Sequence, residues 1–168
     1  MATLGEILAA REARYRRQRA WLTRYRAPLL SCSLRIPGPD KQSPRYRRAF
    51  EAILAAVEKD LPEGTILAKV VLHPETGSEA LYAVAMEPEM LKRRMMAMEE
   101  GHPLGALCDL DVVDRTGQPL GREMLGAAPR RCFCCGRPAR LCTREKRHPL
   151  PEVHAAIDGI LDRWEGIG

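Results

Sequence analysis

Two aspartates in the middle of the chain have a spacing that could hold a metal ion. Asp109 and Asp111 belong to segment 105–114, whose apolar and β-branched residues predict a short strand followed by a turn. Successive side chains of a strand point to opposite faces, so the two carboxylates share one face and repel each other. A divalent cation such as Mg²⁺ would relieve this repulsion and keep open positions for phosphate oxygens. The simpler alternative is a pair of solvated aspartates on a half-exposed strand.

The cysteine-rich stretch nearer the C-terminus is a second candidate site. Four of the six cysteines lie within eleven residues, which favours a local site over a disulfide framework. Three thiolates and one imidazole could bind a structural zinc ion in tetrahedral geometry. These candidate ligands are Cys132, Cys135, Cys142 and His148. Cys134 is a competing ligand, and a group of buried, reduced cysteines beside a basic loop is the alternative interpretation.

A loop rich in proline and glycine, residues 37–44, is a candidate phosphate-binding segment. Ser43 has the position of a helix N-cap, and Pro44 that of the first helical residue. The free N–H groups of that first turn, together with Lys41 and Arg45, could hold an anion. The loop has no Walker motif, so an ordinary strand-to-helix connection is the alternative.

Length and charge narrow the class of protein and its partners. The chain has 168 residues, enough for one domain with its own core. A formal net charge of +5 and a pI near 9.0 indicate an anionic partner, such as phosphate, nucleic acid or an acidic protein. The sequence predicts neither a signal peptide nor a membrane-spanning segment. We therefore expect a cytoplasmic protein with reduced cysteines.

Helical and strand patterns alternate along the chain and must position these residues. Apolar residues at helical spacing predict four helices, at 4–26, 44–60, 88–100 and 151–164. Strands are predicted at 29–36, 66–72, 80–86 and 105–114. The order from residue 28 to residue 114 is therefore β-α-β-β-α-β, the ferredoxin-like pattern. We expect an α+β fold with a mixed or antiparallel sheet.

We expect residues 1–168 to form a single domain that contains four segments of different composition. They are a basic N-terminal helix (1–26), the α+β core (28–114), a cysteine-rich segment (121–148) and a C-terminal helix (151–165). The centre of the first helix carries many arginines. A solvated helix face is one interpretation of this charge, and a docking surface for an acidic partner is the other.

Four short motifs, in a fixed order, resemble those of one protein family. They are Ile36-Pro-Gly-Pro-Asp-Lys41, His102-Pro-Leu-Gly-x-x-x-Asp109-Leu-Asp-Val112, Gly121-Arg-Glu, and Arg131-Cys-x-x-Cys-Gly-x-x-Ala-x-x-Cys-x-Arg144-x-x-x-His148. Together they resemble the apo-citrate lyase phosphoribosyl-dephospho-CoA transferases, from about residue 28 to the C-terminus. Cys108 and Cys134 depart from the expected pattern, because a bulkier apolar or aromatic residue is expected at position 108 and an aliphatic one is usual at position 134.

The resemblance implies a nucleotidyl-transfer reaction. A serine of the acyl carrier protein of citrate lyase would attack the α-phosphate of triphosphoribosyl-dephospho-CoA, and diphosphate would leave. Such a transfer needs a metal ion and basic residues around the phosphates. Asp109 and Asp111 are the expected Mg²⁺ ligands, and His102 would deprotonate the serine or brace its own loop. The expected phosphate contacts are Arg35, Lys41, Arg45 and Arg122.

Two other classes of function fit parts of the sequence. A zinc-knuckle nucleic-acid-binding module would use the basic helix and the cysteines, but it has few aromatic residues for base stacking and no use for the carboxylate pair. A non-catalytic assembly factor of a lyase complex is the other alternative. We expect the transferase, with neither a nucleic-acid nor a membrane partner. A related carrier protein, such as that of malonate decarboxylase, could replace the acceptor.

Overall fold

A four-stranded antiparallel sheet lies at the centre of the computed structural model, which describes residues 3–167. The strands follow one another across the sheet in the order β2-β3-β1-β4. Their bounds are β1 Leu29–Leu34, β2 Ile66–Leu72, β3 Glu79–Val84 and β4 Cys108–Val113. Because β1 lies between β3 and β4, residues far apart in the sequence become neighbours at the middle of the sheet.

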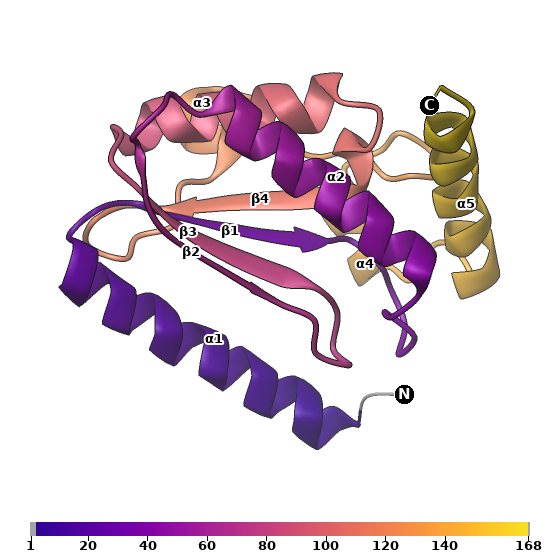
Figure 1. The fold of residues 1–168 in the computed structure, drawn as a ribbon. Coiled ribbons are helices and arrows are strands. Elements are labelled where there is room, and N and C mark those ends of the chain that lie inside the picture. The colour runs from indigo at the N-terminus through magenta and orange to yellow at the C-terminus, as the bar shows by residue number, and fades with distance from the viewer. Residues whose placement is uncertain (1–2, 168) are drawn as a thin grey trace.

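Helices cover both faces of this sheet (Figure 1). The helices α2 (Pro44–Asp60) and α3 (Pro88–Gly101) pack on one face, and α1 (Leu4–Tyr25) lies along the other. The short α4 (Ala139–Arg144) and the C-terminal α5 (Leu150–Ile167) lie beside one end of the sheet (Figure 1). None of the described helices combines the length and the apolar composition needed to cross a membrane.

The structure confirms the expected α+β fold and shows an antiparallel sheet. Each predicted helix and strand is present; α2 and β2 have the predicted bounds, and the ends of the others are shifted by at most three residues. The helix α4 and two short 3-10 helices, η1 (Gly105–Leu107) and η2 (Arg122–Leu125), were not predicted. Because of η1, the strand predicted at 105–114 begins only at Cys108. A Cβ atom at Gly105 would collide with backbone atoms of α3, so glycine allows the tight turn before β4.

The start of α2 follows the prediction closely. The Ser43 hydroxyl accepts a hydrogen bond from the backbone N–H of Tyr46 at 3.1 Å, and Pro44 is the first helical residue. This N-cap satisfies one of the free donors of the first turn. The loop 37–43, which contains Lys41, therefore ends in a fixed position.

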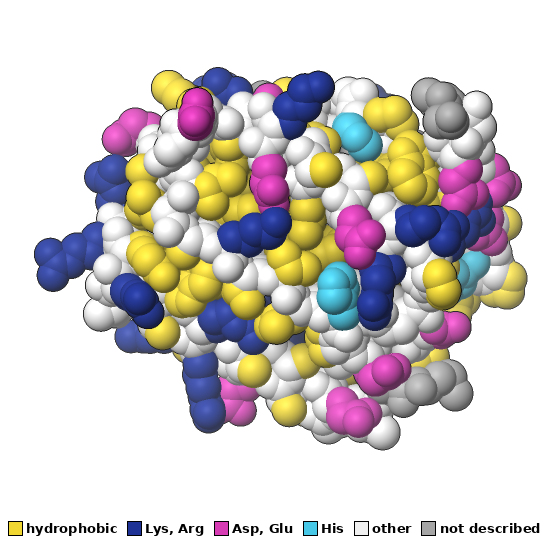
Figure 2. Space-filling view, viewed as in Figure 1, with side chains coloured by type: hydrophobic (Ala, Val, Ile, Leu, Met, Phe, Trp, Pro, Cys, Tyr) yellow, Lys and Arg dark blue, Asp and Glu magenta, His cyan; other side chains and the backbone are white. Residues whose placement is uncertain are grey.

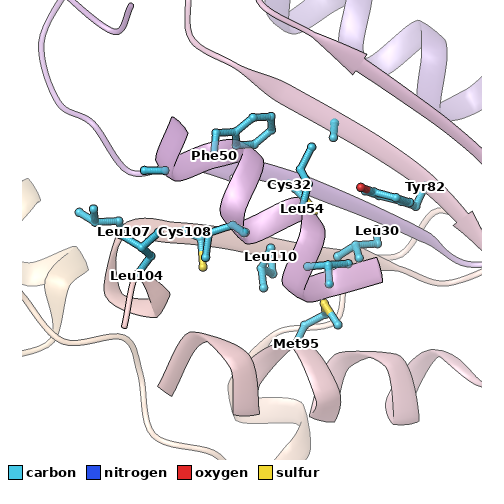
Figure 3. Packing of buried hydrophobic residues seen from close by; sticks show 14 of the residues in the cluster. Leu30, Cys32, Phe50, Leu54, Tyr82, Met95, Leu104, Leu107, Cys108 and Leu110 are labelled. Carbon is cyan, nitrogen blue, oxygen red and sulfur yellow. The ribbon is translucent and has the colours of Figure 1, made fainter. Parts of the chain in front are cut away.

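The sheet face beneath α2 and α3 forms the main hydrophobic core (Figure 3). Leu30 of β1 and Leu110 of β4 are fully buried against Phe50 of α2 and Met95 of α3, and Tyr82 of β3 joins them. Burying a large apolar side chain stabilises the fold by roughly 1.5–3 kcal/mol. This face therefore supplies most of the hydrophobic stabilisation, and the side chains buried in it are mainly apolar.

The opposite face, beneath α1, changes character along the strands. At one end a second apolar cluster contains Leu29, Leu81 and Ala83, against which Trp21 and Tyr25 of α1 pack. At the other end the residues on this face are polar. There Ser33 of β1 pairs with Asp109 of β4 on one side and with Glu79 of β3 on the other. The polar end of this face is where the candidate site lies.

Candidate active site

A cavity of about 830 Å³ opens at the polar end of the sheet. Its walls come from the end of β1, the loop after it, the β2–β3 turn at 76–78, the cysteine-rich segment, the start of α5 and the first half of α1. Six of its lining side chains are basic: Arg11, Arg14, Arg35, Lys41, Lys146 and His148. Among the described lining residues, Asp109 supplies the one carboxylate. The charge of this cavity suits a polyanionic ligand.

The two predicted metal-binding aspartates lie on one face of β4, with Asp109 in the cavity wall. Asp111 lies two residues further along the strand, outside the lining. The Asp111 carboxylate reaches solvent, yet desolvation by surrounding side chains raises its pKa, and the negative charge of Asp109 raises the pKa further. A cation between the two carboxylates would relieve that repulsion. Among residues 3–167, the two groups that combine three or more metal-binding side chains are both elsewhere, in the cysteine-rich segment and α5.

Arg130, which was not predicted from the sequence as a site residue, holds the Asp109 end of β4 in place. Its guanidinium donates to the carbonyl oxygens of Cys108 at 2.8 Å and Gly105 at 3.0 Å. It also lies 2.8 Å from a carboxylate oxygen of the buried Glu99 and 3.6 Å from Asp109. In the sequence, nothing separates Arg130 from the other arginines before the first clustered cysteine.

Two of the four predicted phosphate contacts line the cavity. The guanidinium of Arg35 lies 4.5 Å from the ring centroid of Phe133 and donates to the carbonyl oxygen of Ala106 at 2.9 Å. Burial lowers the pKa of Arg35, and the positive charge of Arg130 lowers it further. Lys41 lies in the loop between β1 and α2 and reaches the cavity beside the β2–β3 turn. Both cations are therefore available to a bound phosphate.

The other two predicted phosphate contacts lie away from the cavity lining. Arg45 pairs with carboxylates of α5, at 3.2 Å from Asp158 and 2.8 Å from Glu165. Figure 2 shows acidic and basic side chains side by side over α5. Arg122 pairs with Glu99 and lies 3.0 Å from Glu100, at the end of α3. The ion pairs of Arg45 join α2 to α5, and those of Arg122 join η2 to α3.

His102 also lies outside the cavity lining. Its Nδ1 atom accepts a hydrogen bond from the backbone N–H of Leu104 at 3.0 Å. Burial lowers the pKa of the imidazole, so the neutral ring that can accept this bond is favoured. Of the two roles considered from the sequence, this geometry favours the brace of the loop that leads into β4.

The predicted cysteine and histidine ligands do converge. The Sγ atoms of Cys132, Cys135 and Cys142 and a ring nitrogen of His148 lie within 4.8 Å of one another. Cys135 Sγ lies 3.5 Å from Cys142 Sγ and 3.3 Å from His148 Nε2. This Cys3His cluster could bind a metal ion. Cys134 belongs instead to a different possible group, with His148 and Glu152.

Hydrogen bonds around the Cys3His cluster favour the binding of a cation. The N–H of Cys132 donates to the carbonyl of Arg137 at 2.7 Å, and Gly136 has a φ of +68°, which permits the tight turn between them. A backbone hydrogen bond from Arg137 and a hydrogen bond from His148 lower the pKa of Cys135 to about 6. Behind the imidazole, Glu152 lies 2.9 Å from His148 Nδ1, which orients Nε2 toward the sulfurs.

Comparison with known proteins identifies the family of this chain. The family model described as apo-citrate lyase phosphoribosyl-dephospho-CoA transferase matches residues 2–164. The chain belongs to this family. A Streptococcus pyogenes serotype M18 protein with the name "Probable apo-citrate lyase phosphoribosyl-dephospho-CoA transferase" is 37% identical over 162 residues, covering 94% of this chain and 84% of its own. A Vibrio cholerae serotype O1 protein with the same name is 35% identical over 160 residues, covering 93% and 89% respectively.

The resemblance inferred from four motifs is thereby confirmed. In this transferase, three of the motifs supply cavity residues: 36–41 through Lys41, 102–112 through Asp109, and 131–148 through three members of the Cys3His cluster. The fourth motif, 121–123, lies at η2, where Arg122 pairs with α3. The family's name describes an enzyme that transfers a phosphoribosyl-dephospho-CoA group to apo-citrate lyase.

Proposed function

We propose that this transferase attaches the 2'-(5''-phosphoribosyl)-3'-dephospho-CoA prosthetic group to a serine of the acyl carrier protein of citrate lyase. The donor is triphosphoribosyl-dephospho-CoA, and diphosphate is released. The observation that carries the proposal is the cavity, where six basic side chains and the carboxylate of Asp109 surround a space of about 830 Å³. A donor with a triphosphate and a nucleotide needs both the charge and the room.

The chain's own residues would divide the work of binding and orientation. Arg35 and Lys41 bind donor phosphates, and their attraction grows as the leaving diphosphate gains charge. Arg130 positions Asp109 through its bonds to the β4 edge. His102 braces the loop before β4. Each of these contacts fixes a group before the reaction, so less reorganisation is required in the transition state.

Asp109 and Asp111 fit a Mg²⁺ ion that is shared with the donor. Their shared strand face and the raised pKa of Asp111 support this assignment. Two carboxylates suffice when phosphate oxygens and water complete the octahedron. When bound, Mg²⁺ would neutralise charge on the transferred phosphate and on the departing diphosphate.

The Cys3His cluster fits a structural zinc ion. Three thiolates and one imidazole are a common zinc ligand set, and none of the four positions is left for a substrate. Cys132, Cys142 and His148 also line the cavity, so zinc would fix one wall of the donor site. All six cysteines are free thiols, which suits the cytoplasmic location that we propose.

We also propose that the core is a ferredoxin-like unit on which the site is built. The element order β1-α2-β2-β3-α3-β4 and the strand order β2-β3-β1-β4 support this. In such an arrangement the cysteine-rich segment and α5 are additions at one end of the sheet. The carboxylates come from the core, and the possible zinc wall comes from these additions.

The test is a transfer assay read by intact mass. Apo-acyl carrier protein of citrate lyase is incubated with this protein, Mg²⁺ and triphosphoribosyl-dephospho-CoA. We expect the mass of the carrier to rise by that of the prosthetic group, and diphosphate to appear in equal amount. A carrier with its acceptor serine replaced by alanine is the control. An unmodified carrier in the presence of a folded, metal-loaded protein would overturn the proposal.

A further inference from the structure

The α1 side of the cavity contains positive charges with no role in the donor contacts described so far. Arg11 and Arg14 line the cavity from α1, and Thr76 lines it from the β2–β3 turn. We propose that these residues, together with Lys41, form a subsite for the diphosphate that leaves the donor. The role in transfer rests on the proposed function, whereas the binding of a free diphosphate does not.

Arg14 is held in position by a buried carboxylate. Glu79 is only 7% exposed, and its Oε2 accepts a hydrogen bond from Arg14 Nε at 2.7 Å. Arg17 takes the other carboxylate oxygen, Oε1, at 2.9 Å. Two guanidinium groups thus share one carboxylate, which leaves an excess positive charge. Of the two, Arg14 lines the cavity and Arg17 does not.

Two further cations near Arg14 have no carboxylate to neutralise them. In the described part of the chain, neither Arg11 nor Lys41 forms an ion pair, although exposed arginines elsewhere on α1 do, as Arg16 does with Glu12. Like charges placed together in a concave surface are unfavourable without an anion. A diphosphate would supply the missing negative charge.

The β2–β3 turn adds an unsatisfied hydroxyl to the same wall. Within residues 3–167, Thr76 Oγ1 is the one buried side-chain oxygen or nitrogen without a hydrogen-bond partner. Leaving such a group unpaired is unfavourable, so a ligand that accepts a hydrogen bond from it is favoured. The turn is fixed to the loop after β1, because the side chain of Gln42 donates to the carbonyl of Pro74 and Lys41 packs over Gly77. The turn that contains Thr76 is therefore held against Lys41, and both residues line the cavity.

The strand register places the subsite at a distance from the β4 aspartates that one triphosphate chain can span. Glu79 and Asp109 both pair with Ser33, on opposite sides of β1. They are two strand spacings apart, which is about 10 Å. Arg14 on Glu79 and the aspartates on β4 can thus contact different phosphates of one extended triphosphate chain.

In the transfer step the serine Oγ forms a bond to the α-phosphorus, and the bond from that phosphorus to its bridging oxygen breaks. The electron pair stays on the diphosphate, and the serine proton passes to water. The negative charge that develops on the leaving group would face Arg11, Arg14 and Lys41. These residues would therefore bind the product as well as the donor.

Isothermal titration with inorganic diphosphate tests this subsite without carrier protein or turnover. We expect Arg11→Gln and Arg14→Gln to weaken diphosphate binding about tenfold each, the scale of one hydrogen bond to a charged group, and Thr76→Val to weaken it less. Arg16→Gln on the same helix, which removes an arginine that pairs with Glu12 outside the cavity lining, is the matched control that should bind normally. Melting temperatures verify that each variant is folded.

Two results would overturn the subsite. One is unchanged diphosphate binding by a folded Arg11→Gln/Arg14→Gln variant, and the other is equal weakening by Arg16→Gln, which would indicate a nonspecific effect of helix charge. Failure of the proposed function gives a different pattern. In that case the wild-type protein binds diphosphate through Arg11 and Arg14 but never modifies the carrier.

Discussion

The two faces of the sheet differ in composition: one is buried and apolar, and the other also lines the cavity. The face beneath α2 and α3 is apolar along its length, with Leu30 and Leu110 fully buried. The face beneath α1 is apolar only at one end, where Leu29 and Leu81 pack, and polar at the other, where Asp109 lies in the cavity wall. The comparison shows that one strand can stabilise the fold on one face and line the cavity on the other, because its side chains alternate.

The strand β4 shows this division residue by residue. Cys108, Leu110 and Val112 are buried, whereas Asp109 and Asp111 point to the face that carries the cavity. A shift of one residue in register would send both carboxylates into the core. The bonds of Arg130 to the start of β4 oppose such a shift.

Substitutions at neighbouring residues of β4 should show the largest difference between the two faces. Asp109→Asn should lower the transfer rate at least about 100-fold with little change in melting temperature, since it removes a proposed metal ligand from a partly exposed position. Leu110→Ala should instead destabilise the fold by about 2–5 kcal/mol, because it leaves a cavity in the core. Single-turnover rates and denaturant unfolding of both variants give the two measurements.

The opposite pattern would contradict this division. It would appear as a folded Asp109→Asn variant with near-normal turnover, or as a Leu110→Ala variant of unchanged stability that has lost transfer. The first result would remove the metal-site assignment. The second would place catalytic work on the core face.

Removal of metal from the Cys3His cluster should have the next largest effect. Elemental analysis of protein purified without added metal should find about one zinc per chain. Chelation should lower the melting temperature by at least about 5 °C and weaken donor binding, because the cluster forms part of the cavity wall. Cys142→Ser should reproduce both effects, and Cys134→Ser, outside the Cys3His set, should reproduce neither. Metal-free protein with unchanged melting and donor affinity would leave these residues as ordinary packing groups.

A third prediction separates two basic residues that flank the start of α2. Lys41→Ala should raise the KM for the donor about tenfold, as expected for the loss of one phosphate contact. Arg45→Ala should leave the KM unchanged and cost about 1 kcal/mol of stability or less, because its partners are exposed carboxylates of α5. Steady-state kinetics and thermal melts decide between them. An increased KM in Arg45→Ala would restore the phosphate role expected from the sequence.

The smallest effect concerns the pH dependence of His102. Burial lowers its pKa below the ordinary value of about 6.5, so as the pH falls the unfolded chain takes up this proton before the folded protein does. The contribution to stability is complete above pH 6.5 and is lost as the pH falls from there toward the folded pKa. His102→Asn should lose this part of the pH dependence while transfer stays within a few-fold of wild type. A large loss of turnover that follows the histidine titration would make His102 a general base instead.

The local features of the site could be predicted from the sequence. The i, i+2 spacing of Asp109 and Asp111 was enough to place them on one face, and the cysteine spacing indicated a cluster. Contacts between residues far apart in the sequence could not be predicted from local patterns. Arg45 follows Pro44 at a helix start that Ser43 caps, an arrangement that suits phosphate binding, but its partners in α5 lie more than 110 residues away. The role of Arg11 depends on which face of the sheet α1 covers, and local sequence patterns do not encode that choice.

Hydrogen–deuterium exchange with and without triphosphoribosyl-dephospho-CoA, in the absence of carrier protein, tests most directly whether the polar end of the α1 face is the donor site. We predict slower exchange in the loop 35–41, the turn 74–78, the segment 132–150 and the first half of α1. The interface between α2 and α3 should be unchanged. Slower exchange confined to the outer surfaces of α2 and α3, with these four segments unaffected, would contradict the account.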